Sequence, residues 1–253
     1  MNKVAFLNLS LHSFNQEGVW KKFFDGGDEN LFNLYIHSKS KKSRFFSDYF
    51  IDKKVPTSWG QFSLVEATIE LIKAALEDEE NEYLSLISDS HLPLYPLDET
   101  VSLIKERYPK TTFAKHFSFH TKVKSQLTFR KGVKDYKFDK YNAVCQFFVL
   151  RRKDAIKFVE TFDHWSKYFV KNEVIFADEF YFWGVAREIG IDFDMGQATT
   201  YSDWSIRKDQ HGKISRNPRA FESFSRAMMQ NYRDRNFLYV RKIMPETFIT
   251  VNL

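Results

Sequence analysis

The stretch that decides the fold is VIFADEFYFWGVAREIGIDFDMGQATTYSDW, Val174–Trp204. It opens on an apolar run, in which we expect a strand, and the adjacent carboxylates Asp178 and Glu179 follow. Apolar residues at helical spacing predict a helix over Phe180–Ile189, and a second short strand is expected over Ala198–Trp204. A carboxylate pair between a strand and a helix lies where open α/β folds place their chemistry.

The carboxylate pair has a structural interpretation beside the functional one. Asp178 is suited to cap the predicted helix, and Glu179 would then be an acid of its first turn. The free N–H groups of a helix start favour negative charge in either case. Motifs elsewhere in the chain are needed to choose between the structural and the functional interpretation.

Composition indicates a globular chain with an aromatic interior. The 253 residues are 43% hydrophobic and 17% aromatic, with 27 Phe and 12 Tyr. We therefore expect an aromatic-rich core and an aromatic-lined cleft. The net charge of +5 is mild, which suits an anionic ligand such as a nucleotide diphosphate better than it suits nucleic acid.

No targeting signal is visible in the sequence. It lacks a signal-peptide pattern and a run of 18 apolar residues, so no membrane span is predicted. Cys145 is the one cysteine, which excludes a disulfide within the chain, and we expect a buried, inert thiol. The sequence therefore predicts a soluble, cytoplasmic protein.

Strands and helices alternate through the first half of the chain. This alternation predicts a doubly wound α/β layout with a mostly parallel, Rossmann-like sheet flanked by helices. Neither a GxGxxG nor a GxxxxGK[ST] motif is present, which disfavours dinucleotide oxidoreductases and P-loop ATPases. The expected strands are Lys3–Leu9, Leu31–Ile36 and Glu82–Ile87, and the expected helices cover Gln16–Phe24, Phe62–Leu76 and Asp98–Tyr108.

The second half is less regular. We expect a basic surface excursion over 110–142, a core strand over Val144–Leu150, a helix over Arg151–Phe162 and a last strand over Phe237–Ile243. Asn217 and Pro218 are typical of a helix start and predict a helix that continues over Arg219–Tyr232. No linker is visible, so we predict one domain over 1–253, with a nucleotide-sugar half (1–108) and an acceptor and catalytic half (109–253).

Ten segments in a fixed order resemble the core-2/I-branching glycosyltransferases, and their plant-type branch most of all. That family includes β-1,6-N-acetylglucosaminyltransferases and peptide O-xylosyltransferases. The segments are KVAFLNL, VWKKFF, LFNLYIHS, SWGQFSLVEA, YLSLISDSHLPLYPL, CQFFVLRRKDA, FADEFYF, TYSDWS, RNPRAF and FLYVRKI. Each is weak alone, but their shared order covers nearly the whole catalytic domain. The resemblance implies a GT-A type fold and inverting transfer from a nucleotide sugar, expected to be a UDP sugar, to a hydroxyl of a glycan or glycoprotein.

The resemblance also implies roles for single residues. The family's catalytic base falls on Glu179, and the two basic groups that hold the donor diphosphate fall on Arg219 and Lys242. The acceptor-site tryptophan falls on Trp204, and we assign Asp178 to the acceptor side with it.

The donor side is expected to be lined by residues of three segments. They are Trp59, the pair Asp89 and Ser90, and the pair His37 and Ser38 at the end of the second strand. The last pair stands where family members often have an acidic residue, and a solvated turn is its structural alternative. The chain also lacks the disulfide cysteines of vertebrate members.

The expected reaction needs a base for the proton of the acceptor hydroxyl and a positive charge that offsets the negative charge of the leaving group. Many GT-A enzymes use a DxD motif to bind a divalent metal, whereas Asp89-Ser90-His91 offers only one carboxylate. We therefore favour Arg219 and Lys242 as the offsetting charges and predict that no cofactor is required, with a metal-dependent reaction as the alternative.

The competing function is a GT-A-like module that binds a nucleotide or glycan without transfer. Nucleic-acid binding through Lys-rich 115–140 is a third and weaker hypothesis.

Overall fold

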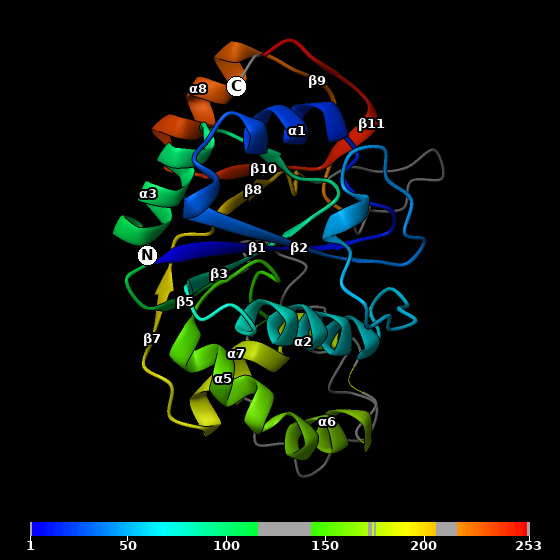
Figure 1. Cartoon of the computed structure of the whole chain (residues 1–253), viewed down its shortest axis with the longest axis vertical. Coiled ribbons are helices and arrows are strands. Elements are labelled where there is room, and N and C mark those ends of the chain that lie inside the picture. The colour runs from blue at the N-terminus through cyan, green and yellow to red at the C-terminus, as the bar shows by residue number, and fades with distance from the viewer. Residues whose placement is uncertain (1, 116–142, 172–173, 175, 206–216, 252–253) are drawn as a thin grey trace.

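A six-stranded, mostly parallel sheet forms the centre of the protein in the computed structural model, which describes residues 2–115, 143–171, 174, 176–205 and 217–251 (Figure 1). Three neighbouring strands are parallel, β6 is antiparallel to both of its neighbours, and β7 is parallel to β5 at the edge. The order is β2 (Phe32–Ser38), β1 (Lys3–Ser10), β3 (Asn81–Ser88), β6 (Val149–Arg151), β5 (Thr111–Ala114) and β7 (Phe193–Gly196). The predicted α/β class with a mostly parallel central sheet is confirmed.

Helices cover both faces of this sheet (Figure 1). One layer contains α1 (Glu17–Asp25), α3 (Leu97–Arg107) and α8 (Arg226–Asp234). The opposite layer contains α2 (Ser63–Leu76), α5 (Arg152–Glu160), α6 (Phe162–Lys171) and α7 (Tyr181–Glu188). The helices predicted at 16–24, 62–76, 98–108 and 180–189 are confirmed within one or two residues at each end.

The alternating side chains of β1 explain why the sheet is covered on both faces. Ala5 and Leu7 belong to the hydrophobic cluster under α2, whereas Val4 and Phe6 belong to the cluster under α1 and α3. All four are fully buried. A strand whose two faces are both apolar is typical of a parallel sheet between two helix layers.

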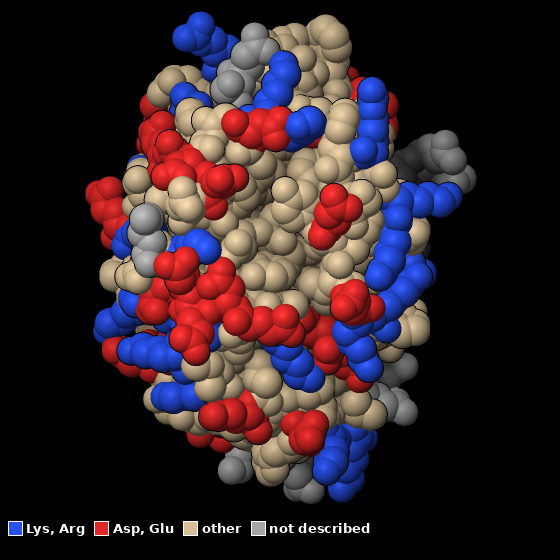
Figure 2. All heavy atoms as spheres, viewed as in Figure 1, with Lys and Arg blue, Asp and Glu red and all other residues tan. Residues whose placement is uncertain are grey.

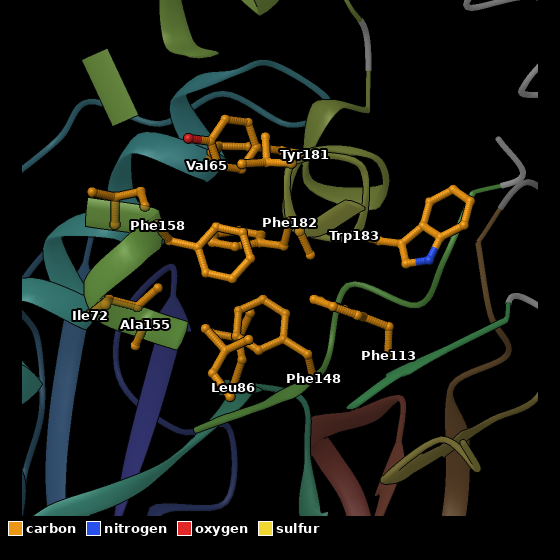
Figure 3. Packing of buried hydrophobic residues seen from close by; sticks show 14 of the residues in the cluster. Val65, Ile72, Leu86, Phe113, Phe148, Ala155, Phe158, Tyr181, Phe182 and Trp183 are labelled. Atoms are coloured by element: carbon orange, nitrogen blue, oxygen red, sulfur yellow. The ribbon is translucent and has the colours of Figure 1, made fainter. Parts of the chain in front are cut away.

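Aromatic side chains fill the layer between the sheet and helices α2, α5 and α7 (Figure 3). Phe148 and Phe182 lie with ring centroids 4.7 Å apart, and Phe158 contacts Phe182 at 5.3 Å. Each such buried side chain contributes roughly 1.5–3 kcal/mol through the hydrophobic effect. The aromatic-rich interior predicted from composition is thus found, and it holds α7 firmly behind the carboxylate pair.

Two small sheets complete the fold. In the first, β10 (Tyr239–Arg241) is antiparallel to β4 (Leu92–Pro93) and parallel to β8 (Thr200–Ser202). In the second, β11 (Ile243–Ile249) is parallel to β9 (Phe221–Phe224). The predicted strands at 198–204 and 237–243 are found in shorter or divided form.

The strand predicted before the carboxylates is wrong. Ala177–Glu179 forms a short 3₁₀ helix, η3, and residues 174 and 176 on its N-terminal side are not in a strand. Phe180 is the residue before the first turn of α7, so Asp178 does not cap that helix. Val174 and Ala177 of this apolar run are buried in the hydrophobic cluster, and burial alone does not distinguish a strand from an irregular segment.

The helix predicted over Arg219–Tyr232 is also wrong in its first half. Residues 221–224 form β9, and α8 begins only after Ser225, whose Oγ accepts a hydrogen bond from the N–H of Met228 at 3.3 Å. The true cap is therefore Ser225 and not Asn217. The pairing of β9 with the distant β11 has no local signal that could have predicted it.

Three further expectations need correction. Only residues 149 and 150 of the strand predicted over 144–150 are in a strand, β6, and the helix predicted over 151–162 is followed directly by α6. Thr111–Ala114, expected in a surface excursion, forms the buried strand β5. The remainder of that excursion, 116–142, lies outside the described residues, as does most of the Lys-rich 115–140 segment. Among the helices that the structure describes, none has the length and apolar character to cross a membrane.

Candidate functional site

A cavity of about 1150 Å³ opens at the carboxyl ends of β1 and β3. Ser10 and Leu11 line it after β1, and Ser88, Asp89 and Ser90 line it after β3. The helices that follow β1 and β2, α1 and α2, lie on opposite faces of the sheet (Figure 1). Such a change of direction leaves a crevice at the carboxyl edge of an open α/β sheet, and ligands bind there.

The turn after β3 is fixed by a buried histidine. The N–H of Ser88 donates to Nδ1 of His91 at 3.0 Å, so the imidazole proton resides on Nε2, which lies 3.1 Å from Oγ1 of Thr200. His91 is fully buried, and burial, followed by the charge of Arg241, places its pKa well below the ordinary 6.5. A neutral His91 thus ties the Asp89–Ser90 turn to β8.

Asp89 and Ser90 both line the cavity, as predicted for the donor side. Asp89 Oδ2 accepts a hydrogen bond from the N–H of Leu11 at 3.2 Å, and the carbonyl of Ser90 accepts one from Ile243 at 2.9 Å. These bonds join the ends of β1 and β3 to the start of β11. The contacts of Asp89 position it on the cavity wall without using its second oxygen.

The two carboxylates of η3 line the same cavity, and both residues are half-buried. The carbonyl of Glu179 accepts a hydrogen bond from the N–H of Val144 at 3.0 Å. Phe180 and Tyr181, directly after Glu179, are buried in the core behind it. The backbone of Glu179 is therefore held rigidly while its side chain faces the cavity.

The loop of Trp59 is attached to the carboxylate segment. The N–H of Phe176 donates to the carbonyl of Gly60 at 2.7 Å, and the rings of Trp59 and Phe176 meet edge to face at 5.1 Å. Gly60 has a φ of 72°, and a Cβ there would lie 3.2 Å from the Phe176 ring. Trp59 lines the cavity with 70% of its surface exposed, so its ring is available to a ligand.

Of the two predicted phosphate-binding residues, Lys242 lines the cavity and the Arg219 side chain does not. Their backbones are adjacent, because the N–H of Lys242 donates to the carbonyl of Arg219 at 3.4 Å. The N–H of Arg219 in turn donates to the carbonyl of Asp203 at 2.7 Å, beside the half-buried Trp204 that lines the cavity. Arg219 itself is exposed at the edge of the site.

The structure places His37 and Ser38 away from the cavity lining. Both are buried. Nε2 of His37 accepts a hydrogen bond from the N–H of Val55 at 3.0 Å, and burial lowers the pKa of His37. Ser38 Oγ accepts from the N–H of Lys41 at 3.0 Å and donates to the carbonyl of Leu11. The observed contacts of both residues hold loops near the site.

Arg241 is a cavity residue that sequence reasoning missed. Its guanidinium lies over the Phe147 ring at 4.7 Å from the centroid. Burial lowers the pKa of Arg241, and the charges of Cys145, Asp89, Asp178 and Glu179 oppose that shift. Arg241 directly precedes Lys242 in the segment FLYVRKI, and this adjacency was the available signal.

Cys145 also lines the cavity, and burial raises the pKa of its thiol, as expected for an inert cysteine. Within the described parts of the chain, no three His, Cys, Asp or Glu residues are grouped so that they could hold a metal ion.

On the face drawn in Figure 2, basic and acidic side chains are interspersed, and basic ones gather along the right-hand edge, where the loops after β2 lie in Figure 1.

Residues 4–232 match the profile of the family described as "Core-2/I-Branching enzyme". The chain belongs to the core-2/I-branching family. The resemblance noted from ten sequence segments is thereby confirmed, and so is the GT-A-like α/β fold.

The chain is similar to a rice glycosyltransferase and weakly similar to a solved structure. "Glycosyltransferase BC10" of Oryza sativa subsp. japonica is 31% identical over 124 residues, which cover 46% of this chain. The aligned part spans only 31% of that protein's length. The crystal structure of "A197 from STIV" has 12% sequence identity and a TM-score of 0.31, over 61% of this chain and 68% of that one.

Proposed function

We propose that the protein is an inverting glycosyltransferase that moves a sugar from a nucleotide sugar, expected to be a UDP sugar, to a hydroxyl group of a glycan or glycoprotein. The observation that carries this proposal is that Glu179 and Lys242 line one cavity at the carboxyl edge of the sheet, together with Trp59 and Trp204. Base, cation and two aromatic walls are the parts that such a transfer needs.

In the proposed reaction, the acceptor oxygen attacks the anomeric carbon from the face opposite the diphosphate. The acceptor O–H proton passes to the Glu179 carboxylate while the bond from the anomeric carbon to the phosphate oxygen breaks. The electron pair of that bond leaves with the diphosphate. A well-placed general base contributes about 10²–10⁴-fold to the rate.

The leaving diphosphate gains negative charge as it departs, and fixed cations can offset that charge. Lys242 is proposed to do so from the cavity wall, with Arg219 contributing from the rim and a bidentate contact available to its guanidinium. We propose that no divalent metal is needed, because these cations supply the charge that a metal would supply. Asp89 and Ser90, beside the ends of β1 and β3, would contact the donor, as would Trp59.

The acceptor is proposed to lie against Trp204, with Asp178 as a hydrogen-bond acceptor for its hydroxyl groups. The half-buried indole offers a flat apolar face, which suits the C–H face of a sugar ring, and the carboxylate lies on the same cavity wall. His37 and Ser38 would act on the donor only through the loops that they hold.

Glu179→Gln is the decisive variant, because it keeps the shape of the side chain and removes the base. We expect transfer and donor hydrolysis to fall at least about 10²-fold while UDP affinity, measured by calorimetry, stays the same. A panel of UDP sugars, including UDP-N-acetylglucosamine and UDP-xylose, would first be ranked by thermal stabilisation. Full turnover by the Gln variant would reject Glu179 as the base.

A binding module without activity is the competing function. It predicts thermal stabilisation by UDP with no release of sugar from any donor in the panel, whether or not Glu179 is intact. Release of sugar by the wild-type protein and its loss in the Gln variant would exclude that alternative.

A further inference from the structure

Three carboxylates of the cavity act electrostatically on one half-buried arginine, Arg241. Asp89, Asp178 and Glu179 line the cavity with Arg241, and each of them exerts an attractive electrostatic effect on it. Asp89 comes from the turn after β3 and the other two from η3, so segments far apart in the sequence meet at Arg241. The proposed reaction so far gives Arg241 no part.

Backbone hydrogen bonds fix the place of Arg241 relative to Glu179. Ile243 donates to the carbonyl of Ser90 at 2.9 Å, which anchors the end of β10 next to Asp89. The Phe147 ring supports the guanidinium from the other side at 4.7 Å. Phe147 lies three residues after Val144, whose N–H donates a hydrogen bond to the carbonyl of Glu179 at 3.0 Å. Arg241 is thus held between the two carboxylate-bearing segments.

The guanidinium also keeps unused hydrogen-bonding capacity. Its Nε is buried and has no hydrogen-bond partner among the described residues. A structural arginine in such a place would use its donors on backbone carbonyls, as Arg152 does with the carbonyls of Leu76 and Asp78, each at 2.8 Å. Arg241 instead presents its charge to the carboxylates around the cavity.

We propose that Arg241 is a positioning residue: its guanidinium, seated on Phe147 at the wall of the cavity, keeps the Glu179 carboxylate ionised and the three acidic side chains in place around the reacting groups. This inference rests on the proposed function, since it needs Glu179 to be the base. A cation close to a carboxylate favours the charged form, which is the form that accepts a proton. The ionisable groups that face Arg241 are Cys145, His91 and the three carboxylates, and Lys242 follows it in the chain.

The test is a direct titration of Glu179 by NMR. Protein labelled with ¹³C at the glutamate carboxyl carbon is titrated in parallel with the Glu179→Gln variant. The signal that is missing from that variant is assigned to Glu179. Arg241→Met should raise the titration midpoint of Glu179 by at least about one pH unit, because the stabilising positive charge is lost. The acid limb of the kcat/KM profile should move to higher pH with it, so that kcat/KM at pH values below both midpoints falls at least about tenfold.

Two further variants control the experiment. Arg44→Met removes a guanidinium that also lies on an aromatic ring, Phe45, at 4.8 Å, but outside the cavity lining; it should leave the midpoint and the rate unchanged. Arg241→Lys keeps the charge and should restore the midpoint to within about half a pH unit of the wild type. If circular dichroism shows that the Met variant is unfolded, Arg241→Gln, which is polar and neutral, replaces it.

An unchanged Glu179 midpoint in a folded, neutral Arg241 variant would overturn the inference, even if its rate fell. That result would leave the proposed function intact, provided Glu179→Gln had abolished turnover. Full turnover by Glu179→Gln would instead remove the proposed function itself. The two failures are therefore distinguishable.

Discussion

Among single residues, His91 makes the stability of the protein depend on pH. It is neutral and fully buried, and its two nitrogens contact Ser88 and Thr200. Its folded-state pKa lies well below 6.5 because burial disfavours the charged imidazole. The unfolded chain binds a proton below pH 6.5 that the folded chain excludes, so stability present above that pH is lost as the pH falls.

We therefore expect the free energy of unfolding to decrease between pH 7 and pH 6, with His91 contributing at most about 1.4 kcal/mol per pH unit. Urea unfolding at the two pH values measures this change. His91→Gln should reduce the pH dependence, whatever its effect on stability at pH 7. Part of the dependence should survive in that variant, because burial lowers the pKa of His37 in the same direction.

Lys242 and Arg219 differ in exposure, and this difference sets a prediction for diphosphate binding. Lys242→Ala should weaken UDP binding by about tenfold, the lower end of what a hydrogen bond to a charged group contributes. Arg219→Ala should weaken it less, because that side chain is exposed and its charge is screened. Calorimetry on both variants checks the order. Equal affinity of Lys242→Ala and the wild type would contradict the role proposed for Lys242.

For single segments, the loop of Trp59 depends on one glycine. Gly60→Ala should destabilise the protein by about 1–2 kcal/mol, because a φ of 72° is unfavourable for alanine and the new Cβ would press on Phe176. Since Phe176 precedes η3, we also expect weaker donor binding. Thermal unfolding and UDP calorimetry would measure both effects.

Gly18→Ala is the matched control for Gly60. Gly18 lies in α1, is exposed, and has no neighbour within 4 Å of an added Cβ. Alanine should stabilise that helix by about 0.4–1 kcal/mol and leave UDP binding unchanged. Destabilisation by both substitutions would mean that the strain argument for Gly60 is wrong.

Sequence periodicity predicted the regular segments and failed where pairing is remote. Phe62, Val65, Ile69 and Ile72 repeat at helical spacing, and α2 forms there because that one stripe can be buried. Phe221, Phe224 and Met228 have the same spacing, yet 221–224 pairs with β11 instead. A local pattern carries no information about a partner strand that arrives later in the chain.

The residues of the candidate site divide in the same way, into those that motif order predicts and those that depend on remote contacts. Glu179, Trp204 and Lys242 could be named from motif order, and all three line the cavity. Arg241 could not, because the role proposed for it depends on Phe147 and on carboxylates of other segments. His37 has the residue type of a site residue, but its ring is directed to Val55.

For the whole molecule, the proposed balance of charge predicts how the reaction responds to chelation. With cations fixed in the fold to receive the diphosphate, turnover of the donor should be unchanged, within about twofold, after EDTA treatment. The measurement is sugar release before and after chelation, with Mn²⁺ added back. Loss of activity that Mn²⁺ restores would show that a metal carries the charge that we assign to Lys242 and Arg219.

The small sheet of β4, β10 and β8 has a consequence for biosynthesis. It brings residues 239–242 between a turn made early in translation and a strand made late. The first sheet strands and their helices can fold while the ribosome is still elongating. The side of the cavity that carries Arg241 and Lys242 cannot, because these residues follow every strand of the central sheet in the chain. The sheet of a nascent chain would therefore be in place before this side of the cavity exists.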